Sequence, residues 1–455
     1  MNRTPRTTSR RRFIAQSAAA IGFPTIVPSS VFGQNAPSNR LTMAIFGWGM
    51  MGPSNTNKFL QEADCQIVAA CDIDKNHLQA ALNTVNGAYK NQDCKGYHDF
   101  REVMARKDID TVMLAVPDNW HALVAIAAAK AGKDIYGEKP LARTIREQQA
   151  IVKAVQDNNR IWQTGSWQRS EDNFRIGAEI VRNGLIGKLN RVEVGLPAGH
   201  TDFAKTADKN QVTEPPAELD YDVWIGPATM EPYIEARIHK NWRWNYNIGG
   251  GQLLDWIGHH CDIAHWGMDC DRSGPTEVKP IQVDMPARTD MWNTATKYRT
   301  EALYAGDIIM TIAGGHNDIQ MGTKWIGTEG TIYVNRNGTY DSSNPDLKQI
   351  IQKREGDKVV EAAKAPKLGD DIIKTRLYET KGHHRNFLDC VKSRQPTVTP
   401  VETAHHSAIP GHLSLISLML NRSIKWDPTK EEIIGDEEAA KMLGREYRAP
   451  WKLEA

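Results

Sequence analysis

The sequence predicts two domains of different class: an α/β domain with a parallel sheet, followed by an α+β domain with a large, mainly antiparallel open sheet. At 455 residues the chain is long enough for two hydrophobic cores. Over residues 41–163, short apolar runs alternate with helical patterns, which is typical of βαβ units whose strands are buried on both faces. Over residues 164–455, the apolar runs are longer, partly alternating and bounded by turn pairs such as Glu329-Gly330, which is typical of antiparallel strands.

The elements follow from where each run begins and ends. In the first domain, strands are expected at residues 41–46, 66–71, 111–116 and 133–136, and helices at 54–61, 75–85, 121–131 and 145–158. In the second domain, strands are expected at residues 190–196, 276–283, 300–305, 307–313 and 331–335, with a helix inserted at 253–266 and further helices around 383–393 and 405–420. The regular alternation stops near Gln163, and we place the domain boundary there.

The first 33 residues have the pattern of a targeting segment. Ser9-Arg10-Arg11-Arg12-Phe13-Ile14 resembles the twin-arginine export signal and precedes a run of small residues. We therefore expect residues 1–33 to be a twin-arginine signal peptide, residues 34–40 to be a linker and the protein to be periplasmic; a disordered basic tail is the alternative. Removing residues 1–33 takes away five arginines and no acid, so the net charge changes from +1 to −4 (+1 − 5). Neither value predicts binding to nucleic acid or to a membrane surface.

A glycine-rich turn follows the first expected strand and opens the first expected helix. It consists of Gly47, Trp48, Gly49, Met50, Met51 and Gly52, which is the pattern G-x-G-x-x-G. Asp72 ends the next strand, 20 residues past Gly52, and completes the dinucleotide-binding fingerprint of a Rossmann domain. Gly47 permits the tight turn, and Gly49 lets a pyrophosphate approach the backbone. Asp72 is expected to accept the ribose hydroxyls, which favours NAD, while Lys75 leaves NADP possible; a glycine turn without a ligand is the alternative.

Three further segments carry a family resemblance. Glu138-Lys139-Pro140 follows a strand, and Gly249-Gly250-Gly251 precedes Asp255 and His259, which lie on one face if this stretch is helical. Gly327-Thr328-Glu329-Gly330 completes the set. These segments resemble the E-K-P, G-G-G…D-x-x-x-H and G-T-x-G segments of the Gfo/Idh/MocA oxidoreductases, the family of glucose-fructose oxidoreductase and inositol dehydrogenase. The resemblance implies a homodimer or homotetramer joined through the open sheet of the second domain.

The resemblance also implies which residues carry the chemistry. Oxidation of a secondary alcohol by nicotinamide needs a base for the hydroxyl proton. Lys139 is expected to hold the reacting hydroxyl and relay its proton, His259 to act as the general base, and Asp255 to orient the substrate or the base. Glu138 is expected to contact the nicotinamide-side ribose.

The loop after the third expected strand is also assigned to the cofactor. Pro117 and His121 are expected to lie near the nicotinamide end, beside Lys139. The residues expected to bind the cofactor thus divide into a group at the glycine turn, near the phosphates, and a group at Lys139, near the reacting nicotinamide.

The residues upstream of the glycine run indicate a sugar or polyol substrate. Trp242 and Arg243 offer an indole face for pyranose C–H groups and donors for hydroxyls, although tryptophans of the core would give the same pattern. Further candidates for substrate contact are Gln168, Arg169 and His260. Because His259 and His260 are adjacent, either imidazole can be the one that faces the substrate.

A cluster on the same expected helix has spacing that can bind zinc. It consists of Asp255, His259, His260, Asp262 and His265. The nicotinamide site already accounts for Asp255 and His259, so we expect no metal.

These patterns predict an NAD(P)-dependent oxidoreductase that acts on CH–OH groups. Because NAD does not circulate freely in the periplasm and the twin-arginine route carries folded proteins, we expect a tightly held nicotinamide that is restored within each cycle. Paired oxidation and reduction of two sugars fits this expectation, and so does transient oxidation that enables glycoside cleavage. A catalytically silent sugar-binding protein is the third alternative.

Overall fold

The computed structural model describes residues 40–348, 353–355, 358–361, 369 and 371–453. The expected signal peptide (residues 1–33) and residues 34–39 of the expected linker lie outside the described residues. Within the described ranges, no helix combines the length and the apolar character that a membrane span requires.

Six strands form a fully parallel sheet in the order β3-β2-β1-β4-β5-β6. Their bounds are β1 Leu41–Phe46, β2 Cys65–Cys71, β3 Lys95–Tyr97, β4 Thr111–Leu114, β5 Asp134–Gly137 and β6 Trp162–Thr164. This order reverses beside β1, which leaves a crevice at the carboxyl ends of the strands. The predicted parallel sheet is confirmed. The sequence pattern does not predict β3 and β6, which have three residues each. Gln163, where we place the domain boundary, lies in β6.

Helices cover both faces of this sheet because its strands carry apolar side chains on both sides. In β1, Met43 and Ile45 join one hydrophobic core, while Ala44 and Phe46 join the other. On the first face lie α2 (Gly52–Phe59), α3 (Lys75–Tyr89) and α11 (His383–Ser393); on the second lie α4 (Phe100–Ala105), α5 (His121–Lys130) and α6 (Ile145–Asp157).

Three of these helices, α3, α4 and α6, begin at side-chain caps that the sequence contains. The carboxylate of Asp74 accepts hydrogen bonds from the backbone N–H groups of Asn76 and His77 at the start of α3. The hydroxyl of Thr144 accepts from the N–H of Glu147 at the start of α6, in a Thr-x-x-Glu arrangement. These caps fix where the helices begin.

Nine strands form the second sheet, in the order β13-β12-β11-β7-β10-β9-β8-β16-β17. All neighbours are antiparallel except β7 and β10, which confirms the predicted large, mainly antiparallel sheet. The strands are β7 Leu189–Leu196, β8 Glu277–Asp284, β9 Lys297–Tyr304, β10 Ile308–Gly314, β11 Gly322–Gly327, β12 Thr331–Asn335, β13 Thr339–Ser342, β16 Ile424–Asp427 and β17 Glu432–Ile433. A separate pair joins β14 (Lys353–Glu355) to β15 (Lys358–Glu361).

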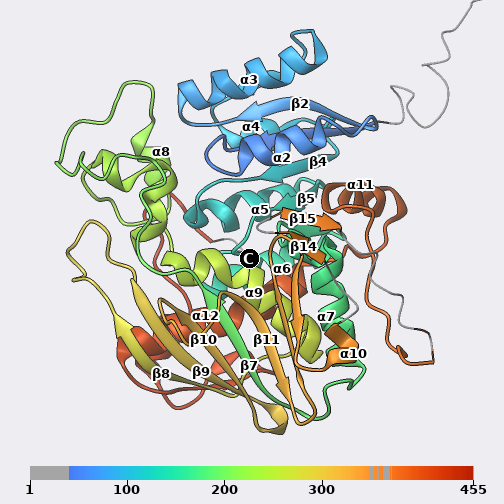
Figure 1. Ribbon diagram of the computed structural model, residues 1–455. Helices are drawn as coiled ribbons and strands as arrows, with labels where there is room; N and C mark the ends of the chain where they lie inside the picture. Colours follow the sequence, from blue (N-terminus) through green and yellow to red (C-terminus); the bar gives the residue numbers. More distant parts are fainter. Residues whose placement is uncertain (1–39, 349–352, 356–357, 362–368, 370, 454–455) are drawn as a thin grey trace, which may run out of the picture. The chain divides into compact units, whose positions relative to one another are not determined.

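Three helices pack on one face of the second sheet: α7 (Asp172–Arg182), α9 (Gly251–Met268) and α12 (Val401–Leu420). Figure 1 shows α9 and α12 with strands β7 to β11. Every second residue of β9 is buried, so one face of that strand contacts the core and the other stays half-exposed. The remaining helices are short: α8 Tyr221–Ile225, α10 Pro345–Lys348 and α13 Glu437–Lys441.

Helix α7 is absent from the sequence prediction although it belongs to the core. Its pattern contains Gly177, a residue that lowers the expectation of a helix. In the structure a Cβ at Gly177 would lie 2.6 Å from Val334 Cγ1, so the glycine allows α7 to pack closely on β12. The packing requirement thus explains why the local pattern is weak.

Candidate active site

A cleft opens where strands of the parallel sheet end. It is lined by residues that directly follow β1, β2, β4 and β5, and on the opposite side by residues of the chain between β7 and α9. All of the cofactor residues named from the sequence line this cleft except Gly52.

The glycine turn has the geometry that a bound diphosphate requires. Gly47 has φ +85°, and a Cβ there would lie 2.5 Å from the carbonyl oxygen of Ala115. A Cβ at Gly52 would lie 2.0 Å from the oxygen of Gly47, so this glycine packs α2 against the turn. A Cβ at Gly49 would meet no atom within 4 Å, which leaves room for a ligand at the start of α2. The residues present therefore fit a dinucleotide.

Asp72 is fixed at the mouth of the cleft by the backbone around it. One carboxylate oxygen accepts a hydrogen bond from Trp48 N–H at 2.7 Å, and the other accepts from Asp74 N–H at 2.9 Å. Burial raises the pKa of Asp72, while His77, with its Nδ1 3.7 Å away, opposes that shift. The carboxylate thus lies beside the glycine turn, where it can accept hydroxyls of the adenosine ribose.

Near the reacting end of the cleft, His121 and Glu138 are held by neighbouring groups. His121 places Nδ1 2.8 Å from the oxygen of Pro140 and Nε2 3.0 Å from the oxygen of Val116. It therefore ties together the loops that follow β4 and β5. Glu138 accepts a hydrogen bond from Asn55 Nδ2 at 2.8 Å, and burial raises its pKa.

Lys139, which lines this cleft, contacts Asp255, which is not among the lining residues, although 116 residues separate the two in the sequence. Lys139 Nζ donates to a carboxylate oxygen of Asp255 at 2.9 Å and to its backbone oxygen at 2.6 Å. Arg243 Nε donates to the same carboxylate oxygen at 2.9 Å. Burial would raise the pKa of Asp255, but Lys139 and Arg243 outweigh it and hold that pKa below its ordinary value. Asp255 is therefore ionised and fixes both cations.

Gly258 allows α9 to lie directly against Lys139. A Cβ at Gly258 would come within 2.9 Å of Lys139 Cβ, and the oxygen of Gly258 accepts a hydrogen bond from Ser166 Oγ at 2.6 Å. Neither Gly258 nor Ser166 is marked by a motif that the sequence prediction used. Their role becomes visible only once β5, β6 and α9 are placed together.

We expect Gly258→Ala to lower kcat while leaving nucleotide binding unchanged, because the added methyl group displaces Lys139. A displacement of about 1 Å at a reacting group can lower the rate by about 10²-fold. The measurement is kcat together with the nucleotide content of the purified variant. Gly87→Ala, where a Cβ would meet nothing within 4 Å, is the matched control. Equal losses in both variants would show that the contact with Lys139 is unimportant.

His259 and His260 are both buried, and neither lines the cleft itself. His259 lies against the rings of Trp167 and Trp256, with centroids 6.2 Å and 5.4 Å away, and its Nδ1 has no hydrogen-bond partner among the described residues. Burial lowers the pKa of His259 well below its ordinary value, and the charge of Lys139 adds to this. Burial also lowers the pKa of His260 to about 3. Both rings are neutral at physiological pH.

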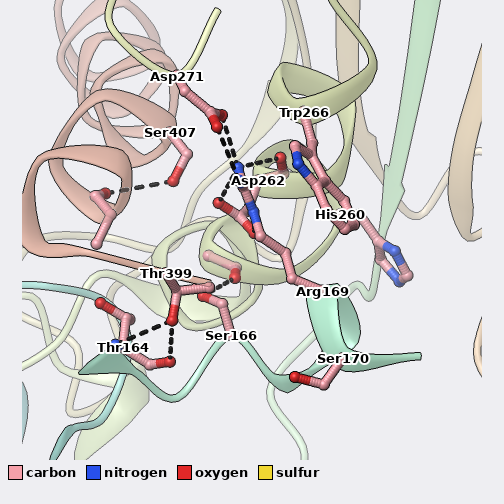
Figure 2. Close-up of polar contacts among 12 residues, drawn as sticks. Thr164, Ser166, Arg169, Ser170, His260, Asp262, Trp266, Asp271, Thr399 and Ser407 are labelled. Atoms are coloured by element: carbon pink, nitrogen blue, oxygen red, sulfur yellow. Dashed lines mark hydrogen bonds and ion pairs between the residues drawn. The ribbon is translucent and has the colours of Figure 1, made fainter. Parts of the chain in front are cut away.

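The structure contradicts the expected substrate contacts of Gln168 and Arg169. Gln168 is fully buried, with Nε2 3.3 Å from His260 Nδ1. Arg169 is 2% exposed and forms ion pairs with Asp262 at 2.8 Å and Asp271 at 2.7 Å, as Figure 2 shows. Burial would lower the pKa of Arg169, but the two carboxylates outweigh it and raise that pKa. Arg169 therefore joins the segment after β6 to α9 and does not reach the cleft.

The five residues with zinc-like spacing do not converge on one point. Asp255 pairs with Lys139, whereas Asp262 pairs with Arg169. His265 Nε2 lies 2.7 Å from the hydroxyl of Tyr304. Each polar group is thus directed to a different partner, and helix α9 does not present them as one ligand set.

A cover segment, defined as residues 218–243, supplies part of the lining of the cleft. The backbone oxygen of Glu218 accepts a hydrogen bond from Lys75 N–H at 3.0 Å. The backbone oxygen of Val223 accepts one from Trp120 Nε1, also at 3.0 Å. The residues of this segment that line the cleft are Asp220, Val223, Trp224, His239, Lys240, Trp242 and Arg243. Trp242 and Arg243, which the sequence analysis names as candidates for substrate contact, thus line the cleft.

Asp118 lines the cleft next to these groups and was not assigned a role from the sequence. It is 3% exposed, and burial raises its pKa to about 7, although Arg243 and Lys139 oppose the shift. The sequence contains no sign of this titration, because the shift arises from burial that only the folded chain creates.

We expect Asp118→Asn to stabilise the protein at alkaline but not at acidic pH. The folded chain holds the Asp118 proton more tightly than an unfolded chain with the ordinary pKa of 3.8. This contribution to stability is therefore complete below about pH 4 and is lost as the pH rises through about 7. At about 1.4 kcal/mol per pKa unit, the variant is expected to gain up to about 4 kcal/mol above that pH.

Unfolding midpoints of both proteins at about pH 4 and about pH 8 test this expectation. Asp307→Asn, at an exposed position, controls for the loss of one negative charge. An advantage of Asp118→Asn that is the same at both pH values would contradict the titration of Asp118.

Comparison with known proteins identifies both domains. Residues 41–166 match the family model described as "Oxidoreductase family, NAD-binding Rossmann fold", and residues 173–453 match "Oxidoreductase family, C-terminal alpha/beta domain". Inositol 2-dehydrogenase of Salmonella typhimurium is 31% identical over 150 residues, which cover 32% of this chain and 43% of that protein. A "Glycosyl hydrolase family 109 protein" of Stenotrophomonas maltophilia is 28% identical over 248 residues, which cover 52% of this chain and 50% of that protein. The chain thus spans half or less of the length of these relatives.

A solved structure shows the same fold over most of the chain. The WlbA dehydrogenase from Bordetella pertussis, in complex with NADH and UDP-GlcNAcA, superposes with a TM-score of 0.60 at 17% identity and covers 85% of this chain and 98% of that chain. With the cleft, the glycine turn and both family domains in agreement, the chain belongs to the Gfo/Idh/MocA oxidoreductase family, and its N-terminal domain is an NAD-binding Rossmann fold.

Proposed function

We propose that this protein transfers hydride between a hydroxyl of a sugar, glycoside or polyol and an NAD that stays bound between turnovers. The observation that carries the proposal is the Lys139–Asp255 pair, with Nζ and the carboxylate oxygen 2.9 Å apart, at the reacting end of the cleft that the glycine turn and Asp72 enter. Names of relatives, inositol 2-dehydrogenase among them, support a polyol or sugar as the substrate.

The residues of this chain would divide the chemistry as follows. When bound, the nicotinamide supplies the hydride acceptor or donor. Lys139 is anchored by Asp255 and donates a further hydrogen bond to the substrate oxygen, which stabilises the negative charge that develops as the hydroxyl loses its proton. His259, one turn beyond Asp255 on α9, is neutral because of its lowered pKa and accepts that proton. The low pKa favours return of the proton in the reverse reaction.

The cover segment supports tight retention of the nucleotide. Its backbone oxygens accept hydrogen bonds from the N–H of Lys75 and from the indole of Trp120, both in the domain of the parallel sheet. Trp451, near the end of the described chain, lines the same cleft and places its ring centroid 4.7 Å from that of Trp120. Release of a dinucleotide therefore requires these contacts to open. Asp72 favours NAD over NADP, because its carboxylate repels a 2′-phosphate.

A second candidate function is glycoside cleavage through transient oxidation. The similarity to a protein named as a member of glycosyl hydrolase family 109 favours it. The same Lys139 and His259 would first hold and take the proton of a ring hydroxyl while its carbon loses a hydride to the bound nicotinamide, and the final reduction would return that hydride and restore the nucleotide. Both candidates thus use one site and differ in whether an aglycone is released.

Location and assembly are part of the same proposal. The pattern around Arg10-Arg11-Arg12 supports export by the twin-arginine route to the periplasm. The face of the second sheet that lacks α9 and α12 carries half-buried charged residues such as Arg299 and Glu301 on β9, and we propose that a homodimer or homotetramer forms there. Retention of the nucleotide would let the protein work where free NAD is absent.

The test is a half-reaction on protein purified without added cofactor. Sugars, polyols and aryl glycosides are added one at a time while the absorbance of reduced nicotinamide is recorded. A hydroxyl donor is expected to raise this absorbance and a second sugar to reverse it; release of the phenol from an aryl glycoside would favour the second candidate. Bound nucleotide whose absorbance no sugar changes would contradict both and would favour a silent sugar-binding protein.

A further inference from the structure

An arginine that the proposed chemistry does not use lies beside the candidate base. Arg336 follows β12, and its guanidinium carbon lies 4.1 Å from the ring centroid of Trp256 and 4.7 Å from that of Trp167. The same two indoles lie against His259. Segments after β6, within α9 and after β12 thus bring one cation, two indole rings and the imidazole of His259 together.

The charge of Arg336 is not balanced within the described part of the chain. No ion pair joins its guanidinium to an acid among the described residues, and its Nε is buried without a partner. By contrast, Arg169 and Arg243, which are more deeply buried than the half-buried Arg336, each pair with a carboxylate at 2.9 Å or less. A half-buried cation that lacks a counter-ion among the described residues is suited to a ligand that brings a negative charge.

The surrounding charges agree with this assignment. Burial lowers the pKa of Arg336, and only the more distant attraction of Glu171 and Asp255 opposes the shift. Burial also raises the pKa of Glu171, which weakens its competition for the guanidinium. Asp255 is already engaged by Lys139 and Arg243.

We propose that Arg336 binds a carboxylate of the substrate, so that the protein acts on a uronate or another sugar acid. The proposal rests on the proposed function, because it assumes that the reacting hydroxyl lies at Lys139 and His259. A guanidinium presents paired N–H donors that match a carboxylate. Trp167 and Trp256 also offer apolar surface to the C–H groups of a pyranose.

The experiment compares matched sugar pairs on the full chain with its own nucleotide. Binding of D-glucuronate against D-glucose, and of D-galacturonate against D-galactose, is followed by tryptophan fluorescence, and turnover by the absorbance of the reduced nicotinamide. The wild type is expected to bind at least one uronate about 10- to 100-fold more tightly than its neutral partner, the range for a hydrogen-bonded charge pair. Arg336→Gln is expected to abolish this preference, and Arg336→Lys to keep part of it.

Arg146→Gln, at an exposed position on α6, is the matched control and is expected to keep the full preference. Equal binding of uronates and neutral sugars by the wild type, or an equal loss of both in Arg336→Gln, would overturn the proposal. Sulfate that competes as well as a uronate would also overturn it, since the site would then take any small anion. Neutral sugars that turn over without a uronate preference refute only the role of Arg336. A uronate preference in binding without any absorbance change supports that role and refutes the proposed function.

Discussion

Replacing Lys139 by methionine is expected to lower kcat by about 10²- to 10⁴-fold, the range for loss of a group that holds and moves a proton. Methionine preserves most of the side-chain volume but donates no hydrogen bond to the substrate oxygen. Asp255 then keeps only Arg243 as a cationic partner. Nucleotide content is expected to stay unchanged, because the glycine turn and Asp72 lie at the other end of the cleft.

The measurement is the rate at which bound nicotinamide is reduced by the best sugar found in the half-reaction screen. Lys153→Met, which removes an exposed lysine of α6 paired with Asp157, controls for the loss of one positive charge. A rate in Lys139→Met within a few-fold of the wild type would show that another group handles the hydroxyl proton. Loss of nucleotide along with activity would assign Lys139 to cofactor binding instead.

Replacing Arg169 by methionine is expected to destabilise the protein by about 3–5 kcal/mol. The change leaves the carboxylates of Asp262 and Asp271 without their cation, and Asp262 is 1% exposed (Figure 2). Burial already raises the pKa of Asp262, with Arg169 opposing the shift, so loss of the arginine removes what keeps that carboxylate charged. The measurement is the midpoint of denaturant-induced unfolding.

A variant that removes all three charges separates this effect from loss of packing. Arg169→Met combined with Asp262→Asn and Asp271→Asn is expected to recover much of the stability, because replacing a whole buried ion cluster is less damaging than breaking it. If the triple variant is as unstable as Arg169→Met alone, the contact of Arg169 with the ring of Trp266 matters more than its charge.

The parts of the fold that could be predicted from the sequence are those whose signal is local. The glycine turn between β1 and α2 and the continuous apolar residues of β1 are contiguous in the chain, and the structure has both where they were expected. Strand β11 and helix α7 were not predicted, because neighbours distant in the sequence determine them. Gly177, for example, is required because Val334 of β12 leaves no room for a Cβ at this position of α7.

The candidate site shows the same division. Lys139 and Asp255 were named through a family resemblance, since 116 intervening residues hide their contact from any local pattern. Arg169 was named as a further polar candidate for substrate contact, yet Asp262 and Asp271, from α9 and beyond, are its partners. Arg336 carries no motif, and its meaning depends on Trp167 and Trp256 being folded around it.

One measurement tests the central claim most directly: denature the protein after purification from the folded-export pathway with no cofactor added, and identify any released nucleotide by mass spectrometry. If the cleft retains its cofactor beneath the cover segment, NAD(H) will be released in an amount close to one per chain. An empty cleft, together with weak binding of added NAD, would contradict a closed redox cycle and would indicate a dehydrogenase that exchanges its cofactor with the solution.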